Sequence, residues 1–190
     1  DYRILTITVS DAHVHNLIEQ NRYLRTPDKL LNEPESQSLA AGIALQRAFK
    51  KYGVRHAISF HRSIRAAKTF RTQHEQIVKS RTTKSVPTCF HVSSQKSTGE
   101  RARLMQQFRD TPSALITNAR CLQEGVDIPA VDCVLFADPK QSVVDIVQAA
   151  GRAMRPYPGK LFGYIVIPIV VPSGMDFDAF ADTTEFRQIA

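Results

Sequence analysis

The chain is poor in cysteine, with three among 190 residues, and it lacks the spacings that cysteine-dependent sites need. Cys89, Cys121 and Cys133 form neither a CxxC pair nor a Cys/His ligand pattern. We expect Cys89 and Cys133, which lie within apolar runs, to be small core residues. A disulfide framework is therefore not expected, which fits a reducing, cytoplasmic compartment. The six histidines show no ligand spacing either, so we expect no metal site.

The chain also lacks a long hydrophobic run. The longest, from Leu161 to Val171, is interrupted by Pro168 and is too short to span a bilayer. No signal peptide is recognisable, and the sequence opens at Asp1 instead of methionine. We therefore expect no membrane partner, and we interpret the chain as a piece of a longer protein.

Acidic residues are scarce in one segment. Between Lys50 and Asp110 there are 14 lysines and arginines against 3 aspartates and glutamates, whereas the rest of the chain has 11 against 15. This imbalance predicts one concentrated basic surface, as expected for a partner with a phosphate backbone. A solvated basic face without a partner would give the same composition.

Apolar periodicity predicts an α/β fold with a mostly parallel central sheet and helices on both faces, because strands and helices alternate. The expected strands are Arg3–Val9, His56–Phe60, Pro87–Val92, Ala114–Thr117, Val131–Ala137 and Gly163–Val171. The expected helices run from Ser10 or Asp11 to about Leu24, from about Gln37 to Tyr52, from a Ser63 cap to about Lys79, from a Thr98 cap past Phe108, and from Ser142 to Met154. Loops are expected at Thr26–Ser38 and Asn118–Pro129. Ligands of such sheets collect beyond the carboxyl ends of the strands, where this chain places mostly polar residues.

Two stretches carry candidate chemistry. In the first, Gln148, Arg152 and Arg155 lie on one face of a helix, and Gly151 leaves room for a close approach. The arginine pair forms a fork suited to a multiply charged oxyanion, although two surface arginines after a helix would look the same. The second stretch follows the strand that ends at Thr117, whose hydroxyl and N–H can bond phosphate. There Gly125 permits a turn and Asp127 can accept bonds from hydroxyls such as those of ribose, or can simply cap the turn.

Together, TNARCLQEGVDIP and QAAGRAMR resemble motifs V and VI of superfamily 2 helicases, in the version of predicted helicases related to restriction-type translocases. Upstream, AISFHRSIRAAKTF is similar to motif IV and HVSSQKSTGERARLMQQF to the segment that follows it. The resemblance covers roughly Arg55 to Val171 and implies the second RecA-like domain of a motor. Residues 1–24 would then be a linker strand and helix, 25–172 the domain, and 173–190 an extension.

The resemblance also implies roles for single residues. Arg152 and Arg155 would reach the phosphates of ATP, with Arg155 the finger on the γ-phosphate, and Gln148 would orient nucleotide or water. Gly125, Asp127 and Gly151 would lie at the nucleotide, with Asp127 near the ribose. The strand of nucleic acid, DNA rather than RNA, would contact a set of polar residues after the strands: Arg62, Ser63, Ser93, Thr117 and Asn118.

The sequence has no GxxxxGK[ST] loop and no acidic box after a strand. A first RecA-like domain would therefore have to hold the phosphates and Mg²⁺, and we expect this chain alone to be inactive as an ATPase. Two alternatives stay open from the residues. One is a non-motor nucleic-acid-binding module of RecA-like shape, and the other is a different nucleotide enzyme on a doubly wound sheet.

Overall fold

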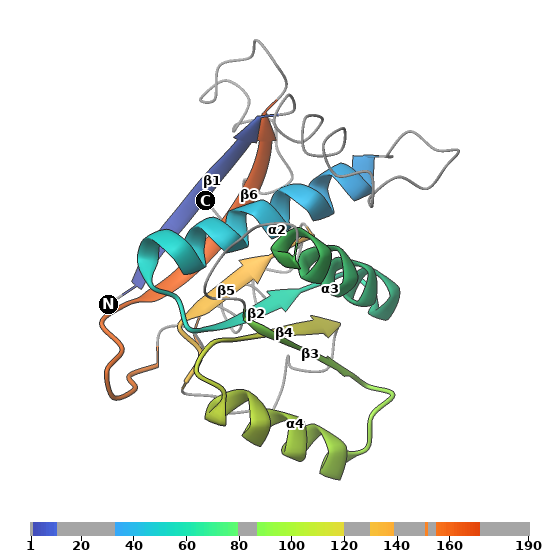
Figure 1. The fold of residues 1–190 in the computed structure, drawn as a ribbon, viewed down its shortest axis with the longest axis vertical. Helices are drawn as coiled ribbons and strands as arrows, with labels where there is room; N and C mark the ends of the chain where they lie inside the picture. Colours follow the sequence, from blue (N-terminus) through green and yellow to red (C-terminus); the bar gives the residue numbers. More distant parts are fainter. Residues whose placement is uncertain are drawn as a thin grey trace.

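The computed structural model describes residues 2–10, 33–79, 87–119, 130–138, 151 and 155–171. They form a six-stranded sheet in the order β1-β6-β5-β2-β4-β3, and every neighbouring pair is parallel (Figure 1). This RecA-like α/β architecture confirms the predicted fold class. No helix in the part of the chain that is described is long and apolar enough to cross a membrane.

All six expected strands are present, with bounds that differ by a few residues. They are β1 (Tyr2–Ser10), β2 (His56–Phe60), β3 (Thr88–Ser93), β4 (Ala114–Ala119), β5 (Cys133–Phe136) and β6 (Gly163–Val171). Three helices lie within the described residues: α2 (Glu33–Tyr52), α3 (Ile64–Lys79) and α4 (Thr98–Asp110). The helices expected after Ser10 and from Ser142 lie outside those residues, apart from helical Gly151.

Alternating strand residues build two separate cores, one on each face of the sheet. On one face Ile58, Phe60 and Ile116 pack with Met105 and Phe108 of α4. On the other face, residues of the same strands pack against α2 and α3, among them Ala57, Leu115, Leu45 and Phe70. Figure 1 shows α2 and α3 side by side in front of the sheet, with α4 away from them. The sheet is thus buried on both sides, which explains its nearly continuous apolar strands.

The structure corrects the predicted beginning of the second helix and the loop before it. The loop was expected to last until Ser38, but α2 already begins at Glu33. Pro34 does not oppose this, because a proline in the first turn removes an N–H group that has no partner within the helix.

Two further boundaries differ from the expectation. The cap of α4 is Ser97 and not Thr98, because Ser97 and Glu100 form a reciprocal capping box: the Ser97 hydroxyl accepts from the Glu100 N–H and the Glu100 carboxylate accepts from the Ser97 N–H. Strand β4 continues to Ala119, so Asn118 belongs to the strand instead of the loop. Asn118 pairs in register with Phe60 and Val92, which explains the longer strand.

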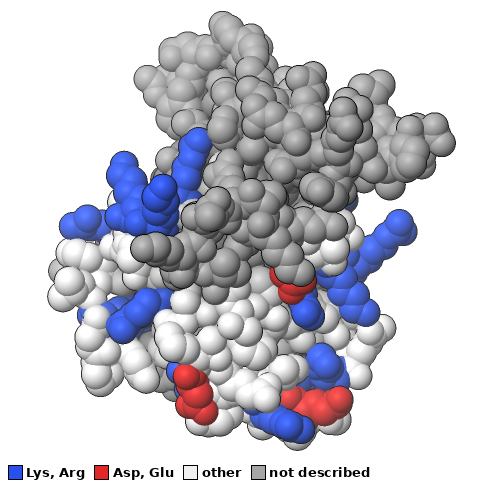
Figure 2. All heavy atoms as spheres, viewed as in Figure 1, with Lys and Arg blue, Asp and Glu red and all other residues white. Residues whose placement is uncertain are grey.

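The described part of the Lys50–Asp110 segment does not form the one concentrated basic surface that was predicted. Helices α3 and α4 both carry several of the cations, but they pack into different cores on opposite faces of the sheet. Arg65 and Lys68 are exposed on α3, and Arg103 and Arg109 on α4. Figure 2 shows basic side chains at several separate places on the face in view, with fewer acidic ones among them. The cations of these two helices therefore lie on opposite sides of the sheet.

His74 of α3 is a buried polar side chain with unusual surroundings. It is 1% exposed, its ring stacks on Phe70 at 5.9 Å, and neither ring nitrogen has a hydrogen-bond partner among the described residues. Burial lowers its pKa to about 4, against a small opposing effect of Glu75. The imidazole is therefore neutral in the folded protein, and the unfolded chain takes up its proton first as the pH falls.

We predict that His74→Leu stabilises the protein and weakens its acid sensitivity. In the wild type, the free energy of unfolding does not depend on His74 protonation above about pH 6.5. Between pH 6.5 and about pH 4, His74 lowers it by about 1.4 kcal/mol for each pH unit. The variant lacks this loss, so the two curves of unfolding free energy against pH diverge as the pH falls. Urea denaturation between pH 7 and pH 4 measures it, and Thr69→Ala, an exposed change in the same helix, is the control. Parallel curves for wild type and His74→Leu would contradict the prediction.

Candidate functional site

All five predicted phosphate-contacting residues lie at the carboxyl edge of the sheet: Arg62, Ser63, Ser93, Thr117 and Asn118. Thr117 is in register with Ser59 of β2 and with His91 of β3, and Ser93 ends β3 opposite Ala119. Ser63 and Arg62 lie in the short connection from β2 to α3 at this same edge. The parallel strands therefore gather residues that are up to 56 positions apart in sequence, as the expected topology required.

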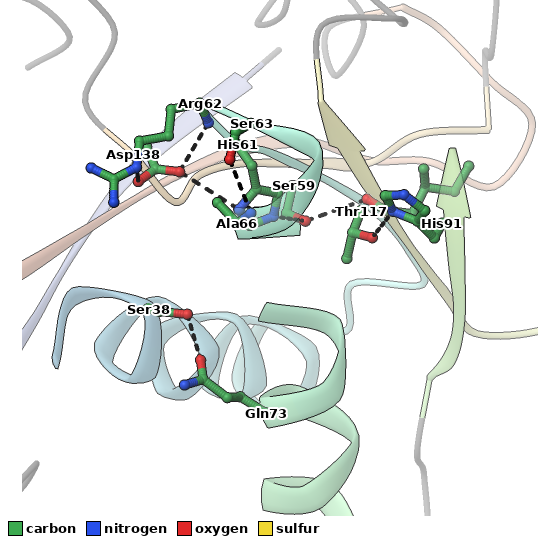
Figure 3. Close-up of polar contacts among 11 residues, drawn as sticks. Ser38, Ser59, His61, Arg62, Ser63, Ala66, Gln73, His91, Thr117 and Asp138 are labelled. Atoms are coloured by element: carbon green, nitrogen blue, oxygen red, sulfur yellow. Dashed lines mark hydrogen bonds and ion pairs between the residues drawn. The ribbon is translucent and has the colours of Figure 1, made fainter. Parts of the chain in front are cut away.

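Three of these side chains are buried. Thr117 and Asn118 are fully buried and Ser93 is 2% exposed. The Thr117 hydroxyl lies 3.0 Å from Nδ1 of His91 (Figure 3), and the Asn118 carbonyl accepts the N–H of His61. In this structure they therefore hold neighbouring strands together, and their surfaces are covered.

His61 links the strand ends further. It is 4% exposed, and its Nε2 lies 2.9 Å from the Ser59 hydroxyl, which itself donates weakly to the Ile116 carbonyl at 3.4 Å. Burial, with the nearby His91 as a second cause, lowers the pKa of His61 to about 3. The imidazole is neutral, so its 3.8 Å approach to the Asp138 carboxylate is a polar contact and not an ion pair.

Asp138, directly after β5, fixes the beginning of the β2–α3 connection. Its carboxylate accepts the N–H of Arg62 at 3.0 Å and lies 3.7 Å from the Arg62 guanidinium (Figure 3). The next residue, Ser63, uses its hydroxyl to cap α3 by accepting the Ala66 N–H at 3.0 Å. Because Arg62 and Ser63 are exposed while their backbone is held, they can present a cation and a hydroxyl to an anion at this edge.

More cations gather around the carboxyl end of β3. After burial, the positive charges of Lys68, Arg71 and Lys96 lower the pKa of His91, which places all three near its ring. Lys68 is exposed on α3, and Lys96 follows β3 in a turn closed by its N–H bond to Ser93. The carboxyl edge therefore carries several positive charges.

Arg155 lies at the other end of the sheet. Nζ of Lys160 donates to the Arg155 carbonyl at 2.8 Å and to the Val131 carbonyl at 2.6 Å. Val131 precedes the amino end of β5, so the backbone of Arg155 lies at the amino edge, and its side chain is exposed. The segment from 155 to 162 leads from there into β6 (Figure 1). The structure therefore does not bring Arg155 together with Thr117.

Asp132 organises this amino edge. Its buried carboxylate accepts the N–H groups of Arg55 and His56, both at 2.9 Å. Its own N–H donates to the His56 carbonyl and its carbonyl accepts from Tyr164. Burial raises the pKa of its carboxyl group, and the two N–H donors oppose that rise. A cavity of about 240 Å³ lies beside Asp132, Arg55, Tyr157 and Lys160.

Four predicted site residues, Gly125, Asp127, Gln148 and Arg152, lie outside the described residues. Gly151 is described, and an added Cβ there would meet nothing within 4 Å. The described residues contain no group of three acidic, histidine or cysteine side chains that could hold a metal ion.

The sequence interpretation missed Asp132 and Lys160. Asp132 was read as one residue of an apolar strand, although a carboxylate inside such a run signals a buried acceptor that needs donors. Lys160 follows Gly159 but belongs to no GxxxxGK[ST] loop, so the sequence assigns it no role. Its contacts with two main-chain carbonyls leave no pattern in the sequence.

Comparison with known proteins gives a consistent family. The sequence profile described as "Helicase conserved C-terminal domain" matches residues 42–157. IRC3 of Saccharomyces cerevisiae, which is assigned as an ATP-dependent helicase, is 29% identical over 76 residues, or 40% of this chain and 11% of its own. MJ1505 of Methanocaldococcus jannaschii, assigned as an ATP-dependent RNA helicase, is 33% identical over 63 residues, or 33% of this chain and 8% of its own.

Solved structures agree with that family. The ATP-dependent Type ISP restriction-modification enzyme LlaBIII, solved bound to DNA, superimposes on 100% of this chain with a TM-score of 0.81 and 27% identity. Domain 2 of the DEAD-box helicase Mss116p, solved with an RNA duplex, covers 97% of this chain with a TM-score of 0.57 and 13% identity, which shows the fold alone. This chain spans 69% of the Mss116p chain but only 13% of LlaBIII, so it corresponds to a small part of that enzyme.

We predict that Asp132→Asn destabilises the protein by about 1–3 kcal/mol, because one of two buried N–H donors would face an amide NH₂ instead of an oxygen. Asp110→Asn is the matched control: that carboxylate is exposed and accepts hydrogen bonds from the side chain of Gln106, so a change within about 0.5 kcal/mol is expected. Urea denaturation measures both. Equal effects of the two changes would show that the Asp132 carboxylate does not hold the amino edge.

Proposed function

Because the chain belongs to the family of helicase conserved C-terminal domains, we propose that it is the second motor domain of an ATP-dependent nucleic-acid helicase or translocase. The observation that carries the proposal is the extent of the match. Residues 42–157 include every residue for which a role was predicted, from Arg62 to Arg155.

The carboxyl edge is proposed as the contact for the nucleic-acid backbone. Arg62 and Ser63 are exposed there, and Lys68, Arg71 and Lys96 lie near His91 beside them. Buried Ser93, Thr117 and Asn118 would act by fixing strand ends and by main-chain groups, or after a local rearrangement. Such contacts position a strand without reading its sequence. The similarity to LlaBIII, which was solved with DNA, supports DNA as the track rather than RNA.

The segment 148–155, called here the arginine segment, is proposed as half of a composite ATP site. Arg155 and Arg152 would offset negative charge on the transferred phosphoryl group, and Gln148 would orient nucleotide or water. Gly125, Asp127 and Gly151 would line the nucleotide, with Asp127 toward the ribose. The exposure of Arg155 and the open space at Gly151 fit an approach from outside this domain. A first RecA-like domain would supply the phosphate loop and the ligands of Mg²⁺.

In this arrangement the sheet couples the two ligands mechanically. The proposed contacts with the nucleic-acid backbone lie at the carboxyl edge of the sheet, and the main chain of Arg155 lies at the amino edge. The sheet therefore separates the two sites as one rigid layer. Closure of the two motor domains around ATP would move the whole sheet and the bound strand together, and hydrolysis would release that closure.

We predict that Arg155→Ala, in a polypeptide with both motor domains, lowers nucleic-acid-stimulated ATP turnover on the order of 10³-fold or more, because a finger acts on the transition state. Binding of nucleic acid should stay nearly unchanged. Arg103→Ala, an exposed arginine on α4, is the control, with assays at saturating nucleic acid. Full turnover by Arg155→Ala would refute the finger. ATP turnover by this 190-residue chain alone would refute the composite ATP site. If nucleic acid binds whether or not Arg155 is replaced, and the two-domain polypeptide shows no motor activity, a non-motor binding module is favoured.

We predict that Lys68→Ala weakens binding of DNA of every sequence and reduces the slope of log affinity against log salt by about 1, because one phosphate contact is lost. Arg103→Ala lies on the helix that covers the opposite face and should leave the slope unchanged. Fluorescence anisotropy with labelled single strands of DNA and RNA over a range of salt measures the effect. Equal slopes for wild type and Lys68→Ala would move the contact surface away from the carboxyl edge.

A further inference from the structure

Lys160 makes two main-chain contacts that are unusual for a lysine. Its ammonium donates to the carbonyls of Arg155 and Val131, at 2.8 and 2.6 Å. A surface lysine normally extends its charged end into water, whereas this side chain is only half exposed and folds back over the amino end of β5. One charged group thus joins the end of the arginine segment to the sheet.

Val131, the acceptor of Lys160 on the sheet, is held firmly in place. Val131 is fully buried, and its neighbour Asp132 is bonded to the main chain of β2 and β6 on both sides. The negative charge of Asp132 also favours the ammonium, although burial is the larger effect and lowers the pKa of Lys160. The Lys160 ammonium is therefore attached beside Asp132, whose carboxylate and main chain bond to the beginnings of β2 and β6.

The loop is shaped to bring Lys160 back to Arg155. The Lys160 N–H donates to the Tyr157 carbonyl at 3.0 Å, and Gly159 adopts a positive φ of 77° that other residues rarely accept. Arg55 adds a weak bond to the Gly159 carbonyl at 3.4 Å. This tight turn returns the chain so that residue 160 can reach the carbonyl of residue 155.

We propose that Lys160 is a positioning residue for Arg155: its ammonium ties the Arg155 carbonyl to the Val131 carbonyl and so sets where the guanidinium is presented. This inference rests on the proposed role of Arg155 as the finger. A finger must meet the phosphoryl group within a fraction of an ångström, and a misplacement of about 1 Å costs on the order of 10²-fold in rate. A backbone fixed to a buried strand meets that requirement, which an unattached loop does not.

The experiment uses a polypeptide with both motor domains and saturating nucleic acid. Lys160→Met keeps the aliphatic stem and removes the donors, and it should lower kcat on the order of 10²-fold. The KM for ATP and the affinity for nucleic acid should change less than about twofold, because neither contact involves Lys160 directly. Lys50→Met, an exposed lysine at the end of α2, is the matched control and should leave kcat unchanged. A kcat for Lys160→Met equal to that of the control would overturn the proposal.

A double-mutant cycle separates positioning from general stabilisation. If Lys160 acts through Arg155, then Lys160→Met should cost nothing further in an Arg155→Ala background. An additional loss of similar size there would overturn the proposal, as would an equal loss of nucleic-acid affinity in the single variant. Should Lys160→Met fail to fold, Lys160→Gln replaces it in the same cycle.

The cycle also distinguishes this inference from the proposed function. If Arg155→Ala itself leaves turnover intact, the finger assignment is wrong and the role of Lys160 falls with it. If Arg155→Ala abolishes turnover but Lys160→Met does not alter it, the finger stands and only the positioning role is refuted.

Discussion

The amino edge of the sheet depends on one interaction: the carboxylate of Asp132 accepts hydrogen bonds from two backbone N–H groups. Together with the main-chain bonds of the same residue, it connects β2, β5 and β6 at the point where all three begin. A buried carboxylate is costly unless donors compensate for lost water, and here they are supplied by strand ends that would otherwise lack partners. These bonds hold the beginnings of the three strands relative to one another.

At the carboxyl edge the corresponding links are made by neutral polar groups. The Ser59 hydroxyl, which lies beside His61, connects β2 to β4, and His91 with Thr117 connects β3 to β4. Burial lowers the pKa of both imidazoles. The charges at this edge are instead on exposed side chains such as Arg62 and Lys68. The buried layer can thus stay rigid while the outer layer meets an anion, a division that suits a surface which binds and releases a polyanion repeatedly.

The sequence predicted the parallel α/β fold because alternating strands and helices leave few other arrangements, and every expected strand is present. The wrong predictions had two causes. Some depended on contacts between segments that are distant in sequence, and one depended on a neighbouring residue that could also cap the helix. Ser97 displaced Thr98 because Glu100 lies three residues after it, and Asn118 joined β4 because strands on both sides pair with it. The division of the basic segment followed from α3 and α4 crossing to opposite faces. Lys160 could not be found, since its acceptors are main-chain carbonyls that any sequence provides.

The pairing of β1 with β6 extends over nine residues, from Tyr2–Gly163 to Ser10–Val171, whereas β6 pairs with β5 at only three positions. Tension along the axis of β1 would load all bonds of the longer ladder at once, in shear, so that they resist together. Strands β1 and β6 would then respond as one stiff unit. Under a pulling force, the sheet would part first along the short β5–β6 junction, where Asp132 and the packing of α2 against β6 provide the remaining resistance.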